Sequence, residues 1–128
     1  MVKSPFELAY RYVEPSVKRR LVLKLLERKI PPIEVSRKLN ISPSLVTRYV
    51  KGDRGVYLEL VKHRDVEEMI EALASDVLRN NMTKHDVQRE VSKITMYVLS
   101  HKYVCNLHKV LERDVDLLQC SICASIFR

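Results

Sequence analysis

Apolar side chains recur every three or four residues along most of this 128-residue chain, which is the spacing of amphipathic α-helices. The chain has only two glycines, whereas strands joined by tight hairpins depend on glycine at their turns. The pattern therefore predicts an all-α fold. One helix begins near Pro5, and the others cover residues 15–29, 32–39, 43–51, 65–79 and 83–100.

Prolines and capping residues mark where these helices begin. Proline fits the first turn of a helix, because its missing N–H would lack a partner there anyway. Four of the five prolines stand at such positions, namely Pro5, Pro15, Pro32 and Pro43. Ser4-Pro5-Phe6-Glu7 is a capping box, and Asp65 with Glu68 and Thr83 with Asp86 repeat its spacing. We expect separate helices from Pro5 and from Pro15, and Asp65 and Thr83 as the starts of the two later helices.

Residues 32 to 51 predict a tight helix-turn-helix. Asn40 tolerates the left-handed backbone that a helix end requires, and Ser42 can cap the helix that begins at Pro43. Ser36 is the small residue expected where the two helices cross. The positions that face inward are apolar: Val35, Leu39, Ile41, Val46 and Tyr49.

The outward face of the second helix has the chemistry of a DNA-reading surface. In helix-turn-helix proteins this face enters the major groove. Here it carries hydroxyls and cations and no Asp or Glu, whereas two helices of an ordinary bundle need no such bias. The candidate DNA-binding residues are Ser42, Pro43, Ser44, Thr47, Arg48, Lys51 and Arg54.

The net charge of +7 is unevenly divided and agrees with this interpretation. Residues 1–64 hold 15 Lys and Arg against 6 Asp and Glu, a net of +9, whereas residues 65–128 hold 8 against 10, a net of −2. Such asymmetry indicates that one half faces a polyanion, and double-stranded DNA is the first candidate. No apolar run approaches the roughly 20 residues of a membrane span, so we expect no membrane partner and a cytoplasmic protein.

Several stretches resemble a known family of regulators. They are Ser4-Pro5-Phe6-Glu7, Tyr12-Val13-Glu14-Pro15, the run from Ile33 to Leu39 and the run from Leu45 to Gly55. Over residues 4–55 the chain is similar to the archaeal XRE-type, lambda-repressor-like transcriptional regulators that carry a cysteine-bearing C-terminal extension. The resemblance implies a lambda-repressor-like DNA-binding domain. Phe6 stands where that family often has a cysteine, and residues 95–98 lack a further Cys-x-x-Cys that the family often has.

The C-terminal segment contains all three cysteines and a candidate metal site. Cys105-x-x-His108 is followed by Cys120-x-x-Cys123, and two such pairs can close a tetrahedral Cys₃His site. These ligands favour Zn²⁺, although the same set could hold an iron–sulfur cluster. The alternatives are that the cysteines pack as small apolar residues, or that they form a redox-active or intersubunit disulfide.

Both glycines lie in Lys51-Gly52-Asp53-Arg54-Gly55, which is the clearest boundary in the chain. We expect a DNA-binding domain in residues 1–55 and a helical module in residues 56–128. The module's apolar stripes are too large for a fragment of about 70 residues to bury alone, which favours a homodimer. The stripe positions are Val66, Met69, Ile70, Leu73 and Val77, and then Val87, Val91, Ile94 and Val98.

Together these features predict a sequence-specific transcriptional regulator that reads a palindromic site through two recognition helices about 34 Å apart. Its cysteine site would be structural or would act as a metal or redox sensor. An alternative is an antitoxin-type interaction module whose C-terminal helices bind a different protein. His63 and His85 have no partner at ligand or triad spacing, and the chain has no glycine-rich phosphate loop, so we do not expect an enzyme.

Overall fold

A computed structural model of the protein describes residues 4–56, 58–103 and 125–126, and these ranges contain helices and no strand. The expected all-α class is therefore confirmed for this part of the chain. The elements are α1 (Pro5–Leu8), η1 (Ala9–Val13), α2 (Glu14–Glu27), α3 (Pro32–Leu39), α4 (Pro43–Lys51), η2 (Leu60–Lys62), α5 (Arg64–Arg79) and α6 (Lys84–Ser100). No described helix is both long and apolar enough to span a membrane.

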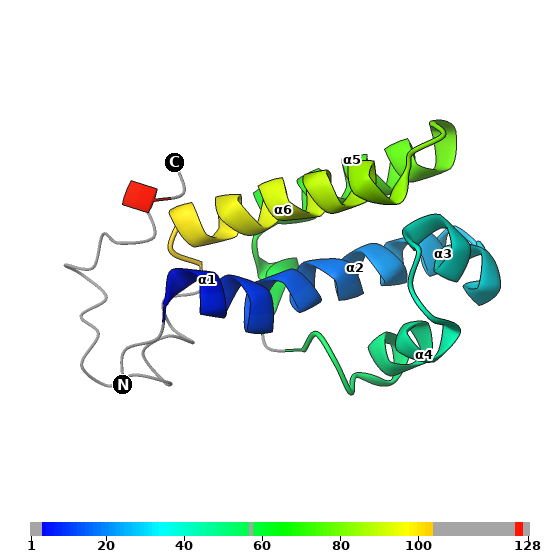
Figure 1. The fold of residues 1–128 in the computed structure, drawn as a ribbon, viewed down its shortest axis with the longest axis horizontal. Helices are drawn as coiled ribbons and strands as arrows, with labels where there is room; N and C mark the ends of the chain where they lie inside the picture. Colours follow the sequence, from blue (N-terminus) through cyan, green and yellow to red (C-terminus); the bar gives the residue numbers. More distant parts are fainter. Residues whose placement is uncertain (1–3, 57, 104–124, 127–128) are drawn as a thin grey trace.

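The first two predicted helices form one continuous rod, so the expectation of a break before Pro15 is wrong (Figure 1). Proline normally kinks a helix, because it lacks an N–H and its ring collides with the carbonyl four residues earlier. Here η1 is a π-helical turn in which the N–H of Glu14 donates to the carbonyl of Ala9, five residues back. Ser16 Oγ then donates to the carbonyl oxygen of Tyr12 at 2.7 Å. The wider turn thus carries the helix past Pro15.

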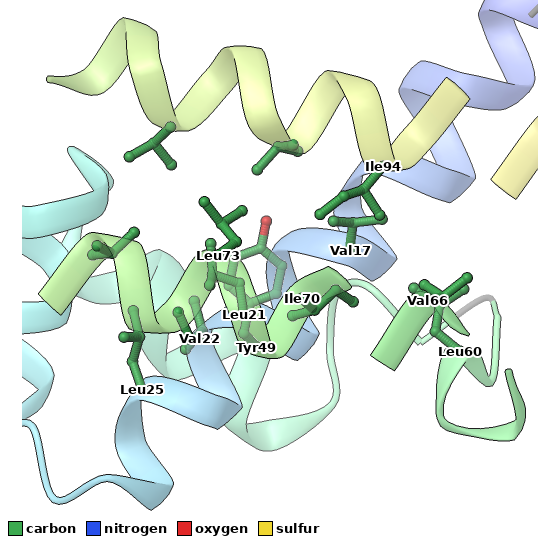
Figure 2. Packing of buried hydrophobic residues seen from close by; sticks show 14 of the residues in the cluster. Val17, Leu21, Val22, Leu25, Tyr49, Leu60, Val66, Ile70, Leu73 and Ile94 are labelled. Carbon is green, nitrogen blue, oxygen red and sulfur yellow. The ribbon is translucent and has the colours of Figure 1, made fainter. Parts of the chain in front are cut away.

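Helix α2 is the centre of the hydrophobic core. Figure 2 shows side chains of α4, α5 and α6 converging on it. Its own contribution is Val17, Leu21, Val22 and Leu25, all of them 1% exposed or less. Core residues come from both sides of residue 55, so the helices on the two sides pack as one unit, and a functional division at that point stays a prediction.

The apolar stripes of α5 and α6 are buried inside this core. All the predicted stripe positions are buried except Met69, which is partly buried and packs against the cluster. Both helices pack against α2 and against each other within the same chain. The stripes therefore give no reason to expect a second subunit, although the homodimer itself is not tested by this finding.

Ion pairs between α2 and α5 account for part of the basic excess in the first half of the chain. Glu67 lies 2.9 Å from Arg20 Nε and 2.8 Å from Lys24 Nζ. Glu71 pairs with Lys24 at 3.1 Å and also with Arg28. These three cations hold two helices together, so the +9 of residues 1–64 overstates the charge that faces a partner.

The two predicted starts of the later helices have different outcomes. Thr83 and Asp86 form the expected capping box, with hydrogen bonds of 3.0 and 3.1 Å. Asp65 does not cap α5, because that helix begins at Arg64 and its N-terminal position is taken by His63 without a side-chain cap. The carboxylate of Asp65 instead accepts hydrogen bonds from tyrosines at the end of α6 and just beyond it.

Candidate nucleic-acid interface

Helices α3 and α4 form the helix-turn-helix that the sequence predicts, with the predicted residues at its turn. Helix α3 ends at Asn40, which is left-handed with φ 55° and ψ 47°. Ser42 Oγ accepts a hydrogen bond from the Leu45 N–H at 3.1 Å and caps α4. Gly52, with φ 79°, ends α4. These local signals set the angle at which α4 leaves α3.

The inward face of this motif is fixed by burial. Val35, Val46 and Tyr49 are 2% exposed or less, and Ser36 is buried. Leu39 and Ile41 are partly buried and pack against the same core. All the predicted inward positions therefore face the core, and α4 is left with one face toward solvent.

Two contacts attach the end of α4 to the central helix. Arg19 of α2 donates from Nε to the carbonyl oxygen of Tyr49 at 3.0 Å, which satisfies a carbonyl in the last turn of α4. Shortly after α4, the backbone of Gly55 packs against α2 at Pro15, with φ 76°. Helix α4 is therefore carried on a rigid element, as precise contacts with a ligand require.

The outward face brings six of the seven predicted DNA-binding residues together in solvent. They are Ser42, Pro43, Ser44, Thr47, Arg48 and Lys51, all exposed. The Thr47 hydroxyl donates to the carbonyl oxygen of Pro43 at 3.2 Å, and the hydroxyls of Ser42 and Ser44 lie 3.1 Å apart. Each hydroxyl oxygen has a second lone pair with which to accept a bond from a base or a water.

Arg48 and Lys51 differ from Arg20 and Lys24 of α2 in having no carboxylate partner within the part of the chain that the structure describes. Arg20 and Lys24 face Glu67, so their charges are neutralised inside the molecule. The α4 cations project from a helix without any acidic residue. They are thus available to phosphates or base edges.

The structure differs from the predicted DNA-binding surface at two residues, Arg54 and Val50. Arg54 is only partly exposed, and its Nε is buried without a hydrogen-bond partner among the described residues. Its role in DNA binding stays a prediction. Val50 was missed, although it follows Thr47 by three positions and is 51% exposed on the same helix. The three-residue spacing from Thr47 was the signal in the sequence that places Val50 on the same side of the helix. A valine methyl group suits contact with the methyl group of thymine.

A second polar cluster lies where the start of α5 meets the end of α6. Tyr97 and Tyr103 donate from their hydroxyls to the same oxygen of Asp65, at 2.5 and 2.7 Å. His63 stacks on Tyr103 and His101 stacks on Tyr97, each with ring centroids 3.9 Å apart.

These two hydrogen bonds shift the acid–base behaviour of the cluster. They hold the pKa of the Asp65 carboxyl below its ordinary value. The bond to Asp65 raises the pKa of Tyr97 to about 12, and it also raises the pKa of Tyr103. The cluster joins the start of α5 to Tyr97 in the last turn of α6 and to Tyr103 just beyond that helix, and the sequence pattern gave no sign of it.

The predicted metal ligands Cys105, His108, Cys120 and Cys123 lie outside the described residues. Within the described ranges, no group of three or more His, Cys, Asp and Glu side chains could hold a metal ion. The Cys₃His site therefore stays a prediction from spacing.

Comparison of the chain with protein-family models, with curated proteins and with solved structures found no match. The geometry of α3 and α4 and the chemistry of their exposed side chains are therefore the basis for proposing a function.

Proposed function

We propose that the protein binds double-stranded DNA sequence-specifically, with α4 in the major groove, and acts as a transcriptional regulator. The observation that carries the proposal is the exposed face of α4, where hydroxyls, a valine and two cations without an ion pair among the described residues lie together, and where α4 itself contributes no acidic side chain. Its opposite face is buried through Val46 and Tyr49. The resemblance of residues 4–55 to lambda-repressor-like regulators agrees with this role, which is not enzymatic.

The side chains on the exposed face of α4 suit different parts of a DNA site. Arg48 can pair with O6 and N7 of guanine, and Thr47 and Ser44 can reach other base edges. Lys51, in the last turn of α4, is suited to a phosphate. Selection of bound sequences from random duplex DNA tests the proposal. A defined motif is expected, whereas a pool that stays unenriched after several rounds contradicts it.

Homodimer formation is part of the proposal, because a regulator of this kind reads two half-sites one turn of DNA apart. The apolar stripes of α5 and α6 do not support a homodimer, because they are buried within one chain. Large apolar side chains remain exposed on the rod, with Phe6 at 65% and Tyr10 at 72%, four residues apart. Sedimentation equilibrium is expected to give twice the chain mass, and a monomer at high concentration contradicts the dimer.

The metal site is a separate part of the proposal and rests on the spacing of the cysteine segment alone. We propose that Cys105, His108, Cys120 and Cys123 hold Zn²⁺ or an iron–sulfur cluster, with a structural or sensing role. A sensor changes DNA affinity when its metal is removed or its thiols are oxidised. Repeating the sequence selection with and without reductant separates this role from a purely structural one.

The structure does not supply the exposed apolar stripes on which the antitoxin-type alternative depends. That alternative needed the apolar stripes of α5 and α6 to be available to a different protein. They are instead covered by α2. DNA binding is the function that the described surface supports best.

A further inference from the structure

Two adjoining hollows lie between the helix-turn-helix and the start of α6. The first has a volume of about 250 Å³ and lies between α2, the turn after α3, and α6. The second has a volume of about 390 Å³ and lies between the end of α3 and the connection from α5 to α6. Asn40 and Lys84 line both of them, so the two hollows meet at these residues.

The first hollow has an apolar floor. Leu21 and Val22 of α2 and Val87 and Val91 of α6 are buried residues of the core and form its floor together with Leu39 and Ile41. The remaining lining residues are polar or charged: Lys18, Asn40, Lys84, His85 and Gln88. The volume of this hollow is below the roughly 300–1,000 Å³ of pockets for drug-sized ligands. The space therefore suits a compact apolar group such as one aromatic ring or a short branched chain.

The second hollow and the shared rim are cationic and amide-rich. Lys38 and Lys84 have no ion pair among the described residues, and the amides of Asn40 and Asn80 lie beside them. His85 lies on the rim of the first hollow. Lys84 and His85 also stand in the first turn of α6, where the helix dipole favours an anion.

The acidic side chains near the two hollows all have partners. Of the residues that line either hollow in the described structure, none is Asp or Glu. Glu14 is paired with Lys18 at 2.9 Å, and Glu34 with Arg37 at 3.0 Å. The Asp86 carboxylate lies close enough to His85 to interact with it electrostatically, and it accepts a hydrogen bond from the backbone N–H of Thr83 in the capping box.

We infer that these hollows form a binding site for a small organic carboxylate, with its apolar body in the first hollow and its carboxylate at Lys84. An apolar pocket with a few convergent polar groups is the usual form of a small-molecule site. Asn40 and Ile41, which connect α3 to α4, line the site, so its occupant contacts the turn that sets the angle of α4. An effect on DNA affinity rests on the proposed function, whereas binding of the carboxylate does not.

Calorimetric titration of the full chain with benzoate and with 3-methylbutanoate tests the inference, and the matching amides serve as neutral controls. Saturable binding of an acid, about tenfold tighter than its amide, is expected from a charge-assisted contact. Methyl NMR signals of Ile41, Val87 and Val91 should shift with the acid. Equal binding of acid and amide, or no saturation of either acid by about 10 mM, overturns the inference.

A pair of double variants localises the site. Lys84→Gln with His85→Gln should weaken the acid about tenfold, because it removes the Lys84 ammonium group and the His85 imidazole from the rim. Arg89→Gln with Lys93→Gln removes two charges from the same helix at exposed positions outside both hollows and should leave the affinity unchanged. Equal weakening by both pairs would contradict the assignment. Titration of DNA with and without benzoate then tests regulation separately, so failed DNA binding leaves the ligand result intact.

Discussion

Gly55 lies directly against the backbone of Pro15, so closely that a Cβ on Gly55 would be 2.5 Å from the Pro15 carbonyl oxygen and 2.8 Å from Arg19 Cβ. Pro15 belongs to the continuous rod of α1, η1 and α2, and Gly55 to the segment that follows α4. This contact is where the end of the helix-turn-helix meets the central helix. It depends on the absence of a side chain and on a positive φ of 76°.

Gly55→Ala is expected to lower the free energy of unfolding by about 2–4 kcal/mol, because it adds a backbone collision to the cost of the left-handed conformation. Gly52→Ala is the matched control. Gly52 has φ 79°, but its Cβ would lie 3.7 Å from Val56 Cγ1, which is an ordinary contact. It should cost only about 1–2 kcal/mol. Urea unfolding measures both, and equal losses would contradict the close packing of Gly55.

Glu67→Gln is expected to destabilise the protein by about 1–3 kcal/mol, because it leaves Arg20 and Lys24 without their shared carboxylate. The Glu67 side chain is only 16% exposed. Glu68→Gln makes the same change on the next residue, where the side chain is 69% exposed and, among the described residues, pairs with Arg64 alone. That variant should cost less than about 0.5 kcal/mol. Denaturant midpoints compare the two, and similar losses would show that the α2–α5 ion pairs are not stabilising.

Asp65→Asn is expected to lower the pKa of Tyr97 from about 12 toward its ordinary value, because the hydroxyl loses a charged acceptor. Ultraviolet titration of tyrosinate measures this change. Asp76→Asn, an exposed position on the same helix, is the control and should leave the tyrosine titration unaltered. An unchanged titration in Asp65→Asn would mean that the cluster does not form in solution.

The same cluster predicts the direction of pH effects on stability. The Asp65 pKa is lowered in the folded protein, so its contribution is present above the ordinary carboxyl pKa and is lost as pH falls through the folded value. The Tyr97 pKa is raised, so its contribution is present below about 10 and is lost as pH rises through about 12. Both effects should disappear in Asp65→Asn.

The sequence predicted local features well, because their signals lie within a few residues. Asn40, Ser42 and Pro43 set the turn and cap of the helix-turn-helix by their own backbone preferences, and the structure has them as expected. The exposed face of α4 followed from the same spacing. Its DNA-binding role rests on residue chemistry and awaits a binding measurement.

The failures concern residues that are far apart in the chain or respond to local geometry. Pro15 usually separates helices, but a π-helical turn that no spacing rule marks allows it to continue. Arg20 and Glu67 are 47 positions apart. The charge count over residues 1–64 therefore attributed the positive charge of Arg20 to a surface that faces a partner, whereas the structure pairs it with Glu67 inside the molecule. Asp65 has the spacing of a helix cap, yet two distant tyrosines take its carboxylate.

Elemental analysis of protein purified without oxygen tests the cysteine segment. About one zinc per chain, or iron with sulfide, is expected if Cys105, His108, Cys120 and Cys123 act together. Cys123→Ser should lower the metal content, while His85→Gln, outside the set, should not. Protein that is folded, fully reduced and free of stoichiometric zinc and iron contradicts the site.

The most direct test of the central claim is the affinity of Arg48→Ala for the selected duplex, with Arg64→Ala as the control. Both variants remove one exposed arginine, but Arg64 is at the start of α5, where it pairs with Glu68. Arg48→Ala should weaken binding by about 1–3 kcal/mol, roughly 5- to 150-fold, and relax the preference at one base pair. Arg64→Ala should change it less than about twofold. Equal affinities of both variants, with the base preference intact, would show that α4 does not read DNA.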